Sequence, residues 1–389
     1  MKTEKTNVYT DCIHFPLDRP CENQKKFAVK CGDCLQYQKI SSEISKTRIL
    51  IIKLGAMGDV LRTVFLLEGL KEKYPSSYIT WIVLPKNAAV LENNPYIDKI
   101  VLCDEKINSF LTGVFFDIVV NLDLSPESLA LTKLAFASKI LGYSLDNERK
   151  ITVSNLYASM WLNMSADDSL KKENERTYQY FMSKIVELPS DQNEIIVPLN
   201  LKMKSKAEEF LRQKGIKTDK AIIGINPGAG KRWLLKKWKI EKFIETARYF
   251  AGKGHIILLL GGKDDAEEIE TIVKAGIENV FSTGTENEIA YFFALINLCS
   301  LVLCGDTMAL HAAVGLKKKV AALFGPTSYN EIELYGRGIK IIPKMDCLCC
   351  YLQSCPKKTT CMDLIEVKTV IEAADILLSG KTAPSIMIS

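Results

Sequence analysis

The residues best placed to do chemistry begin with a carboxylate behind two glycines, in the segment Leu54–Asp59 (LGAMGD). Gly55 and Gly58 allow a tight turn and a close approach of the backbone to a ligand. The segment lacks one glycine of the dinucleotide fingerprint G-x-G-x-x-G and the Gly-Lys-Ser/Thr of a P-loop. Asp59 therefore remains as a carboxylate that either serves a site at this loop or caps the helix that follows it.

A second segment combines glycines with positive charge. Gly228 and Gly230 lie in the turn PGAG, and six basic residues follow between positions 231 and 242. Glycines that expose backbone N–H groups beside cations, close to the start of a helix, form an anion site. The alternative is a solvated run of charge, although Trp233 and Trp238 inside the run are hard to explain as solvated surface.

Two later segments carry acidic and hydroxyl side chains. The segment GGKDD contains Asp264, which suits the start of a helix; a role in holding a ribose is the alternative. The segment CGDTMALH places Asp306 and Thr307 where a strand gives way to a helix, with His311 about one turn inside it. A lone helical histidine is more often packed or on the surface, but its place behind an Asp-Thr turn favours function.

Parallel strands must bring these segments together. The branched residues of Arg48–Leu54 predict a buried parallel strand, helical spacing predicts a helix over Asp59–Lys73, and Tyr78–Leu84 predicts the next strand. This order breaks at Ile195–Leu201 and restarts at Ala221–Asn226. We therefore predict two doubly wound α/β domains with helices on both faces of parallel sheets. Ligands bind at the carboxyl ends of such strands, where the four segments lie.

The predicted boundaries are residues 1–46 for a cysteine-rich extension, 47–200 for the first domain and 201–389 for the second. Further strands are predicted over Lys99–Leu102, Ile118–Leu122, Ile140–Tyr143, His255–Leu260, Leu301–Cys304 and Val320–Phe324. Further helices are predicted over Pro126–Ser138, Leu156–Asn163, Arg176–Leu188, Ile240–Ala251, Asp264–Lys274, Glu288–Leu298, Thr307–Val314 and Asp363–Leu378.

Composition narrows the class of protein. The chain has 389 residues, of which 47% are apolar and 25% charged, as in an ordinary folded protein. A net charge of +5 is too mild to predict a nucleic-acid partner. The start has no apolar run suited to a signal peptide, and no stretch reaches the roughly 20 apolar residues of a membrane span. We therefore expect a cytoplasmic protein.

Taken together, the segments resemble glycosyltransferase family 9, the ADP-heptose:lipopolysaccharide heptosyltransferase family. The resemblance rests on LGAMGDVLRT, PGAG with the following KKW, GGKDD, GDTMALHAA and ALFGPTS, in family order and at family-like spacing. It covers roughly Arg48 to the end of the chain. Two departures are Met308, where the family has a glycine, and Lys239, where it usually has a proline.

The resemblance implies a GT-B fold, in which an N-terminal acceptor domain and a C-terminal nucleotide-sugar domain face a cleft. It implies that Asp59 is the catalytic base, with Gly55, Met57 and Gly58 in its loop, and that Lys236 acts on the leaving group. The residues expected to bind the donor are Gly228, Gly230, Lys231, Lys237, Asp264, Asp306, Thr307 and His311.

The function expected from this resemblance is inverting transfer of a sugar, heptose from ADP-heptose, to a hydroxyl of a glycan or glycolipid such as the lipopolysaccharide core. The alternatives are another GT-B nucleotide-sugar enzyme of the epimerase type, a protein-directed glycosyltransferase, and a non-catalytic scaffold. Catalysis is expected to need no cofactor, because cations and amides already face the phosphates. Peripheral contact with the inner membrane surface is a further expectation.

Nine of the twelve cysteines form two clusters, which in a chain without a secretion signal indicate metal or redox chemistry. Cys12, Cys21, Cys31 and Cys34 provide four thiolates with one close C-x-x-C pair, which suits a structural Zn²⁺. An Fe–S centre or free thiols are the alternatives. A second cluster of five cysteines lies between positions 347 and 361. It resembles a cysteine-bearing loop of the same family and could bind a metal or simply pack.

Overall fold

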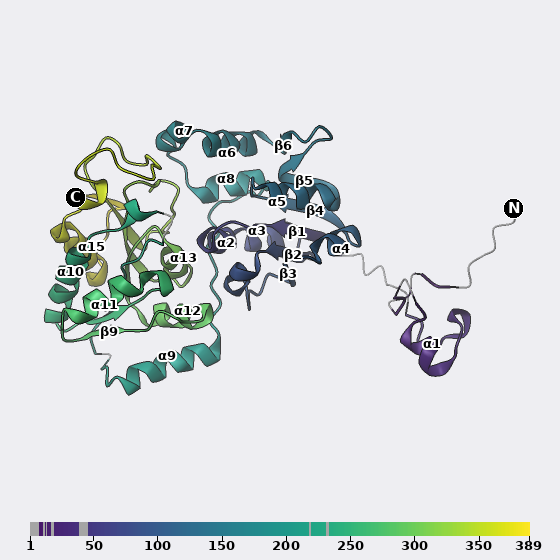
Figure 1. Ribbon diagram of the computed structural model, residues 1–389, viewed down its shortest axis with the longest axis horizontal. Coiled ribbons are helices and arrows are strands. Elements are labelled where there is room, and N and C mark those ends of the chain that lie inside the picture. The colour runs from purple at the N-terminus through teal and green to yellow at the C-terminus, as the bar shows by residue number, and fades with distance from the viewer. Residues whose placement is uncertain are drawn as a thin grey trace. The chain divides into compact units, whose positions relative to one another are not determined.

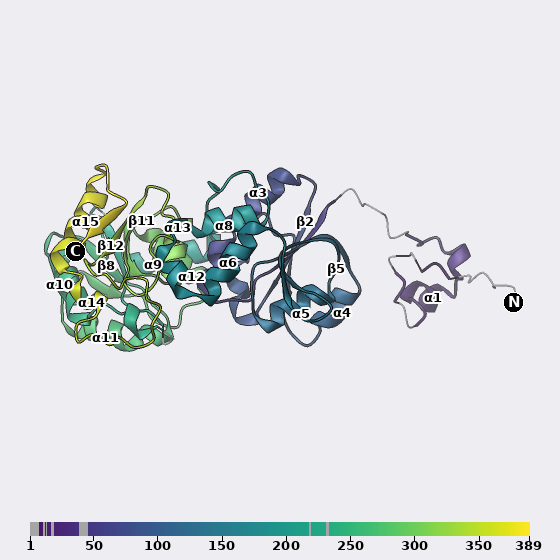
Figure 2. The ribbon, with the colours of Figure 1, turned by 90° about the horizontal axis from the view of Figure 1, so that it is seen from above.

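The computed structural model describes residues 8–10, 12, 14–16, 19–38, 46–217, 219–230 and 233–389. The chain divides into two compact units, Met1–Thr47 and Arg48–Ser389. The larger unit contains two α/β domains, each built on its own sheet (Figures 1 and 2). We call them the first domain and the second domain.

The sheet of the first domain has the order β3-β2-β1-β4-β5-β6. Its strands are β1 (Arg48–Ile52), β2 (Tyr78–Val83), β3 (Lys99–Leu102), β4 (Phe115–Asn121), β5 (Phe136–Leu145) and β6 (Ile151–Val153). The central strand β1 pairs in parallel with β2 and β4, and its residues 49–52 are fully buried, as the run of branched residues predicts. Strand β6 is antiparallel to β5, which corrects the expectation of a purely parallel sheet.

Helices cover this sheet (Figure 1). They are α2 (Met57–Thr63), α3 (Leu66–Lys73), α4 (Ile107–Thr112), α5 (Pro126–Leu134), α6 (Leu156–Ala166), α7 (Asp168–Glu173) and α8 (Tyr178–Ile185), with a 3₁₀ segment at Pro85–Val90. The single helix predicted over Asp59–Lys73 is in fact two, α2 and α3, separated by a turn at Val64 and Phe65 whose backbone stays in the right-handed helical region. Helix α5 ends four residues before the predicted Ser138, since Phe136 already pairs with Phe115 of β4.

The sheet of the second domain is parallel throughout, in the order β13-β12-β11-β10-β7-β8-β9. Its strands are β7 (Ile222–Asn226), β8 (Ile256–Leu259), β9 (Val280–Ser282), β10 (Leu301–Gly305), β11 (Lys319–Leu323), β12 (Gly338–Ile342) and β13 (Ile386–Ile388). Its helices are α9 (Leu201–Gln213), α10 (Ile240–Gly252), α11 (Ala266–Lys274), α12 (Ile289–Leu298), α13 (Met308–Gly315), α14 (Cys361–Leu364) and α15 (Val367–Ser379). The prediction of two doubly wound domains is confirmed.

Helix α13 of the second domain packs against α2 of the first, so the starts of these two helices meet at the domain boundary. Among the described residues, no helix is long and apolar enough to cross a membrane.

The small N-terminal unit contains helix α1 (Glu22–Phe27) and a 3₁₀ turn at Cys31–Asp33. The Cys21 thiol accepts a hydrogen bond from the Gln24 N–H at 3.4 Å and so caps α1. None of the described residues between positions 8 and 38 is buried. This unit therefore has no hydrophobic core of its own among those residues.

Candidate active site

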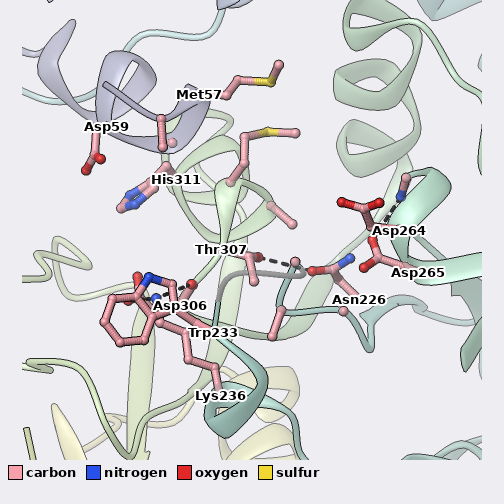
Figure 3. Close-up of a pocket in the computed structure, with 18 of the residues that line it drawn as sticks. Met57, Asp59, Asn226, Trp233, Lys236, Asp264, Asp265, Asp306, Thr307 and His311 are labelled. Atoms are coloured by element: carbon pink, nitrogen blue, oxygen red, sulfur yellow. Dashed lines mark hydrogen bonds and ion pairs between the residues drawn. The ribbon is translucent and has the colours of Figure 1, made fainter. Parts of the chain in front are cut away.

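A cavity of about 770 Å³ lies between the two domains, within the range of about 300–1,000 Å³ that small-molecule sites usually have. Its walls come from the start of α2, the loops after β7 and β8, the start of α13, and the segment that follows β11. Figure 3 shows Asp59 and His311 in one part of this cavity and Asn226, Asp264 and Asp265 in another. The strand ends of both sheets thus contribute to one site.

The segment LGAMGD is held by a buried ion pair beneath it. Asp123 accepts the N–H groups of Leu54 and Gly55 and pairs with Lys53 Nζ at 2.5 Å. On the other side, Asn87 Nδ2 donates to the Gly55 carbonyl at 2.6 Å. Gly55 is therefore fixed in the wall behind the cavity, while Met57, Gly58 and Asp59 line it.

Asp59 lies inside the first turn of α2, and Ala56 occupies the N-cap position, so the alternative of a capping role for Asp59 is wrong. Its side chain keeps 40% of its surface exposed, and Arg62 Nη2 lies 2.9 Å from its Oδ1. Burial opposes the charged form, but Arg62 and then Lys53 outweigh it and lower the pKa of Asp59 below its usual range. Asp59 is therefore ionised at neutral pH.

Gly58 allows the two domains to approach each other at this point. A Cβ atom at Gly58 would lie 3.2 Å from His311 Cδ2 and 3.5 Å from Met308 Cα, both on α13. His311 is 7% exposed, and burial, aided by the nearby Arg62 charge, lowers its pKa to about 4. Its imidazole is consequently neutral at pH 7 and lines the cavity beside Asp59 (Figure 3).

Lys236 and Asp306 form an ion pair in the cavity wall. Lys236 Nζ lies 2.7 Å from Asp306 Oδ2, which also accepts the Thr327 hydroxyl at 2.8 Å. Burial opposes ionisation of Asp306, but Lys236 outweighs it and holds the pKa of Asp306 well below its usual range. The neighbouring Lys237 is not among the described cavity-lining residues and instead pairs with Glu268. Lys231 lies outside the described residues.

The glycine turns place backbone on the opposite wall. Gly228 faces Asp265 so closely that a Cβ atom there would lie 1.8 Å from Asp265 Oδ1, and Gly230 has a positive φ of 67°. Asp265 also accepts the Gly262 N–H at 2.9 Å and thereby holds the GGKDD loop. Asp264 lines the cavity beside it. A side chain at Gly228 would therefore displace Asp265, and the φ of Gly230 favours glycine.

The start of α13 is open to the cavity. Thr307 is the N-cap residue, but its hydroxyl donates to Asn226 Oδ1 at 3.1 Å rather than capping the helix. Met308 and Ala309, the first two residues of α13, line the cavity. An uncapped helix start attracts anions through its N–H groups and its dipole.

The cavity wall also contains polar residues that were not among those predicted from the sequence, including Arg62, Asn226, Asp265 and Glu331. Arg62 follows Asp59 at the i, i+3 spacing of one helical turn, which is a signal that the sequence contained. Asn226 ends strand β7, where ligand contacts are expected. Glu331 had no comparable signal, because its place depends on how the two domains pack.

The C-terminal cysteine segment supports the cavity through its backbone. The N–H groups of Cys349 and Tyr351 donate to the carbonyls of Gly325 and Pro326, at 3.0 and 2.9 Å. These bonds bring Tyr351 to the cavity wall. In the part of the chain that the structure describes, no three His, Cys, Asp or Glu side chains are placed to share a metal ion. Both cysteine clusters lie within the described residues.

Solved structures share this arrangement of domains. A glycosyltransferase family 9 protein of Veillonella parvula aligns with a TM-score of 0.73 and 22% identity, over 86% of this chain and 98% of that one. The Escherichia coli ADP-heptose lps heptosyltransferase II aligns with a TM-score of 0.63 and 18% identity, over 86% and 99%. Two doubly wound domains around a cleft define the fold as GT-B.

The sequence comparisons identify the family. The model of glycosyltransferase family 9 (heptosyltransferase) matches residues 106–361, more than half of the chain, and the chain belongs to this family. Lipooligosaccharide heptosyltransferase 2 of Campylobacter jejuni is 26% identical over 209 residues, which are 52% of this chain and 63%, just under two thirds, of that protein. Lipopolysaccharide heptosyltransferase 1 of Pseudomonas aeruginosa is 21% identical over 340 residues, 80% of this chain and 88% of that one.

Proposed function

We propose that this protein transfers heptose from ADP-heptose to a hydroxyl group of a cell-surface glycan precursor such as the lipopolysaccharide core, with inversion at the anomeric carbon. The observation that carries the proposal is that an ionised carboxylate, Asp59, shares one cavity with Lys236 and the glycine turns. A lysine and glycine-rich backbone are suited to binding a diphosphate. The names of the related heptosyltransferases support heptose as the sugar and the lipopolysaccharide core as the acceptor.

In the proposed reaction, the acceptor hydroxyl oxygen attacks the anomeric carbon and gives its proton to Asp59. The bond between that carbon and the diphosphate oxygen breaks, and its electron pair leaves with the nucleotide diphosphate. A positioned base of this kind contributes about 10²–10⁴-fold to the rate. Because its pKa is lowered, Asp59 is ionised at neutral pH, which is the form that accepts a proton.

The leaving diphosphate is stabilised by the second domain. Lys236 supplies a positive charge, and the amides of the glycine turns and of the α13 start supply N–H donors that face the cavity. Fixed donors aimed at developing charge are often the largest contribution to catalysis. His311 is neutral and adds no charge at pH 7, so we assign it to packing and hydrogen bonding beside the donor.

A glycolipid acceptor would be met at the inner membrane surface, and we propose peripheral contact there. Co-sedimentation with vesicles of phosphatidylethanolamine and phosphatidylglycerol tests this contact. Binding that weakens with salt supports it, whereas protein that stays in the supernatant at low salt contradicts it.

The donor is tested by thermal shift with ADP-heptose, UDP-N-acetylglucosamine and GDP-mannose, each followed by an assay for nucleotide release with and without a delipidated core acceptor. The proposal expects stabilisation by ADP-heptose above the other two, because a ligand that binds the native state raises its stability. It also expects ADP release that depends on the acceptor. Acceptor-independent isomerisation of the sugar would instead indicate an epimerase-type enzyme.

A further inference from the structure

Arg62 is a partly buried cation of the cavity wall to which the proposed transfer gives no role. Its side chain is 16% exposed and lies on α2, one turn after Asp59. The guanidinium carbon stacks on the ring of Tyr178, 3.9 Å from the ring centroid. The Tyr178 hydroxyl in turn is 2.7 Å from the Thr63 hydroxyl. This stack fixes the plane of the guanidinium and leaves its N–H edges to pair with acidic groups.

Two carboxylates from different domains lie at those edges. Arg62 Nη2 is 2.9 Å from Asp59 Oδ1, while Nη1 is 3.9 Å from Oε2 of Glu331, in the segment after β11 of the second domain. Glu331 is 9% exposed, and its main-chain carbonyl accepts the N–H of Tyr178 at 2.9 Å. Tyr178, whose ring supports the Arg62 guanidinium, therefore also holds the backbone of Glu331 in place.

These two carboxylates do not use all the N–H donors of Arg62. Its Nε is buried and has no hydrogen-bond partner within the described residues. The 3.9 Å separation from Glu331 is an ion pair but is longer than a hydrogen bond. A guanidinium has five N–H donors, so a small shift towards Glu331 would weaken its hold on Asp59.

We propose that Arg62 is the positioning residue of Asp59, and that Glu331 competes for this arginine from the second domain; the proposal rests on Asp59 being the base of the proposed function. While Arg62 holds Asp59, the carboxylate stays ionised and aimed at the acceptor as the substrates displace water. When the Arg62 guanidinium shifts from Asp59 towards Glu331, the pKa of Asp59 rises and Asp59 becomes a stronger base. Glu331 thereby makes the strength of the base depend on the placement of the two domains.

The charges around these groups set the pH dependence. Asp59 faces Arg62, Lys53, His311 and Asp306. Arg62 also faces Tyr178, Glu331 and Asp306, and Glu331 also faces Asp306, Lys171 and Tyr351. Among the attractive charges at Asp59, Arg62 contributes most, so loss of this cation raises the pKa of Asp59.

The first test is the pH profile of kcat/KM for Arg62→Gln between pH 4 and 8. In the native protein the pKa of Asp59 is lowered from its usual range, so the profile should show no acid inflection from this group. In Arg62→Gln an inflection should enter the range, because one close opposite charge commonly shifts a pKa by about 1–3 units. Arg62→Lys should remove the inflection again while kcat stays below native, since an ammonium keeps the charge but not the planar fork.

The second test is Glu331→Gln, which keeps the shape of the side chain and leaves Arg62 entirely to Asp59. The weaker base should lower kcat about two- to tenfold, with an unchanged KM for the donor and no acid inflection. Arg337→Ala is the matched control, because Arg337 forms another Arg–Glu pair, with Glu194 at 2.9 and 2.7 Å, away from Asp59.

An unchanged profile in Arg62→Gln overturns the proposal, and so does an acid inflection of the same size in Arg337→Ala. An Asp59→Asn protein that still turns over would defeat the proposed function instead. If Asp59→Asn is inactive and Arg62→Gln has the native profile, only the role of Arg62 is lost.

Discussion

The two walls of the cleft, one from each domain, differ in the groups that they place against the cavity. The first-domain wall presents side-chain charges, Asp59 and Arg62, above the buried pair of Lys53 and Asp123. The second-domain wall combines the glycine turns and the start of α13 with two cations, Lys236 and Lys263, and several carboxylates. Amides suit a diphosphate that must bind and then leave, whereas a proton acceptor needs a side chain with a defined pKa. Changes to the first wall should therefore affect turnover, and changes to the second wall should affect donor affinity.

The largest expected effect is that of Asp59→Asn. Asparagine keeps the shape of the side chain but cannot take the acceptor proton, so kcat should fall by about 10²–10⁴-fold. Affinity for ADP, measured by calorimetry, should stay within about twofold, because the amides and Lys236 are untouched.

Asp104→Asn is the control for that change, since Asp104 is an exposed residue of the first domain whose carboxylate accepts the Lys106 N–H at 2.9 Å. Its turnover should match the native protein. A native kcat in Asp59→Asn would show that the first-domain wall does not accept the proton. It would contradict the view that the first wall determines turnover and the second wall determines donor affinity.

Lys236→Ala should have the next largest effect and should act on affinity. Loss of a charge-assisted hydrogen bond commonly costs about 1.5–3 kcal/mol, or roughly 10–100-fold in the Kd for ADP. The loss should shrink at high salt, because screening weakens the attraction in the native protein. Asp306 loses its partner in this variant, so the melting temperature is measured alongside to separate weaker binding from unfolding.

Lys237→Ala sharpens the contrast, because this neighbouring lysine pairs with Glu268 instead of lining the cavity. A partly exposed ion pair contributes little, about 0–1 kcal/mol, so ADP affinity and kcat should change by about twofold or less. Equal losses of ADP affinity in Lys236→Ala and Lys237→Ala would show that the whole basic segment, and not one residue, holds the diphosphate.

Sequence patterns predict the domain architecture and the central strands of this molecule better than its peripheral helices and strands. The predicted bounds of β1 and β2 agree with the structure within two residues, because buried parallel strands appear as runs of branched residues. Asp59, Lys236, Asp306 and His311 do line one cavity, since strand ends of a doubly wound sheet share an edge. Helix α9 and strands β12 and β13 were not predicted, and their stability comes from packing on partners distant in the sequence.

The site details that the sequence could not provide depend on the meeting of two domains. Glu331 reaches Arg62 only because the segment after β11 bonds to the start of α8. The difference between Lys236 and Lys237 follows from a 3₁₀ turn at Leu234–Lys236, after which the two side chains have different partners. Neither a periodicity nor a motif records these contacts.

The smallest expected effect on transfer comes from a region that belongs to neither wall. Cys12, Cys21, Cys31 and Cys34 line one cavity of about 460 Å³ in the N-terminal unit. Because none of the described residues between positions 8 and 38 is buried, apolar packing among them cannot hold this unit together. We predict that the four thiolates fold it around one structural Zn²⁺, and that the thiols move together as the ion binds.

Elemental analysis of the purified native chain should show zinc that is lost in Cys31→Ser/Cys34→Ser, and the segment before Ser45 should then become sensitive to protease. Transfer should stay close to native, since no described residue of this unit lines the cavity between the two domains. The matched control, Cys347→Ser/Cys350→Ser, removes a C-x-x-C pair from the other cluster and should leave that zinc in place. Zinc lost only in the control would assign the ion to the C-terminal cluster. Iron with visible absorption would indicate an iron centre, and a metal-free native chain would leave four ordinary thiols. A loss of transfer in Cys31→Ser/Cys34→Ser as large as that of Asp59→Asn would show that the chemistry extends beyond the two walls of the cleft.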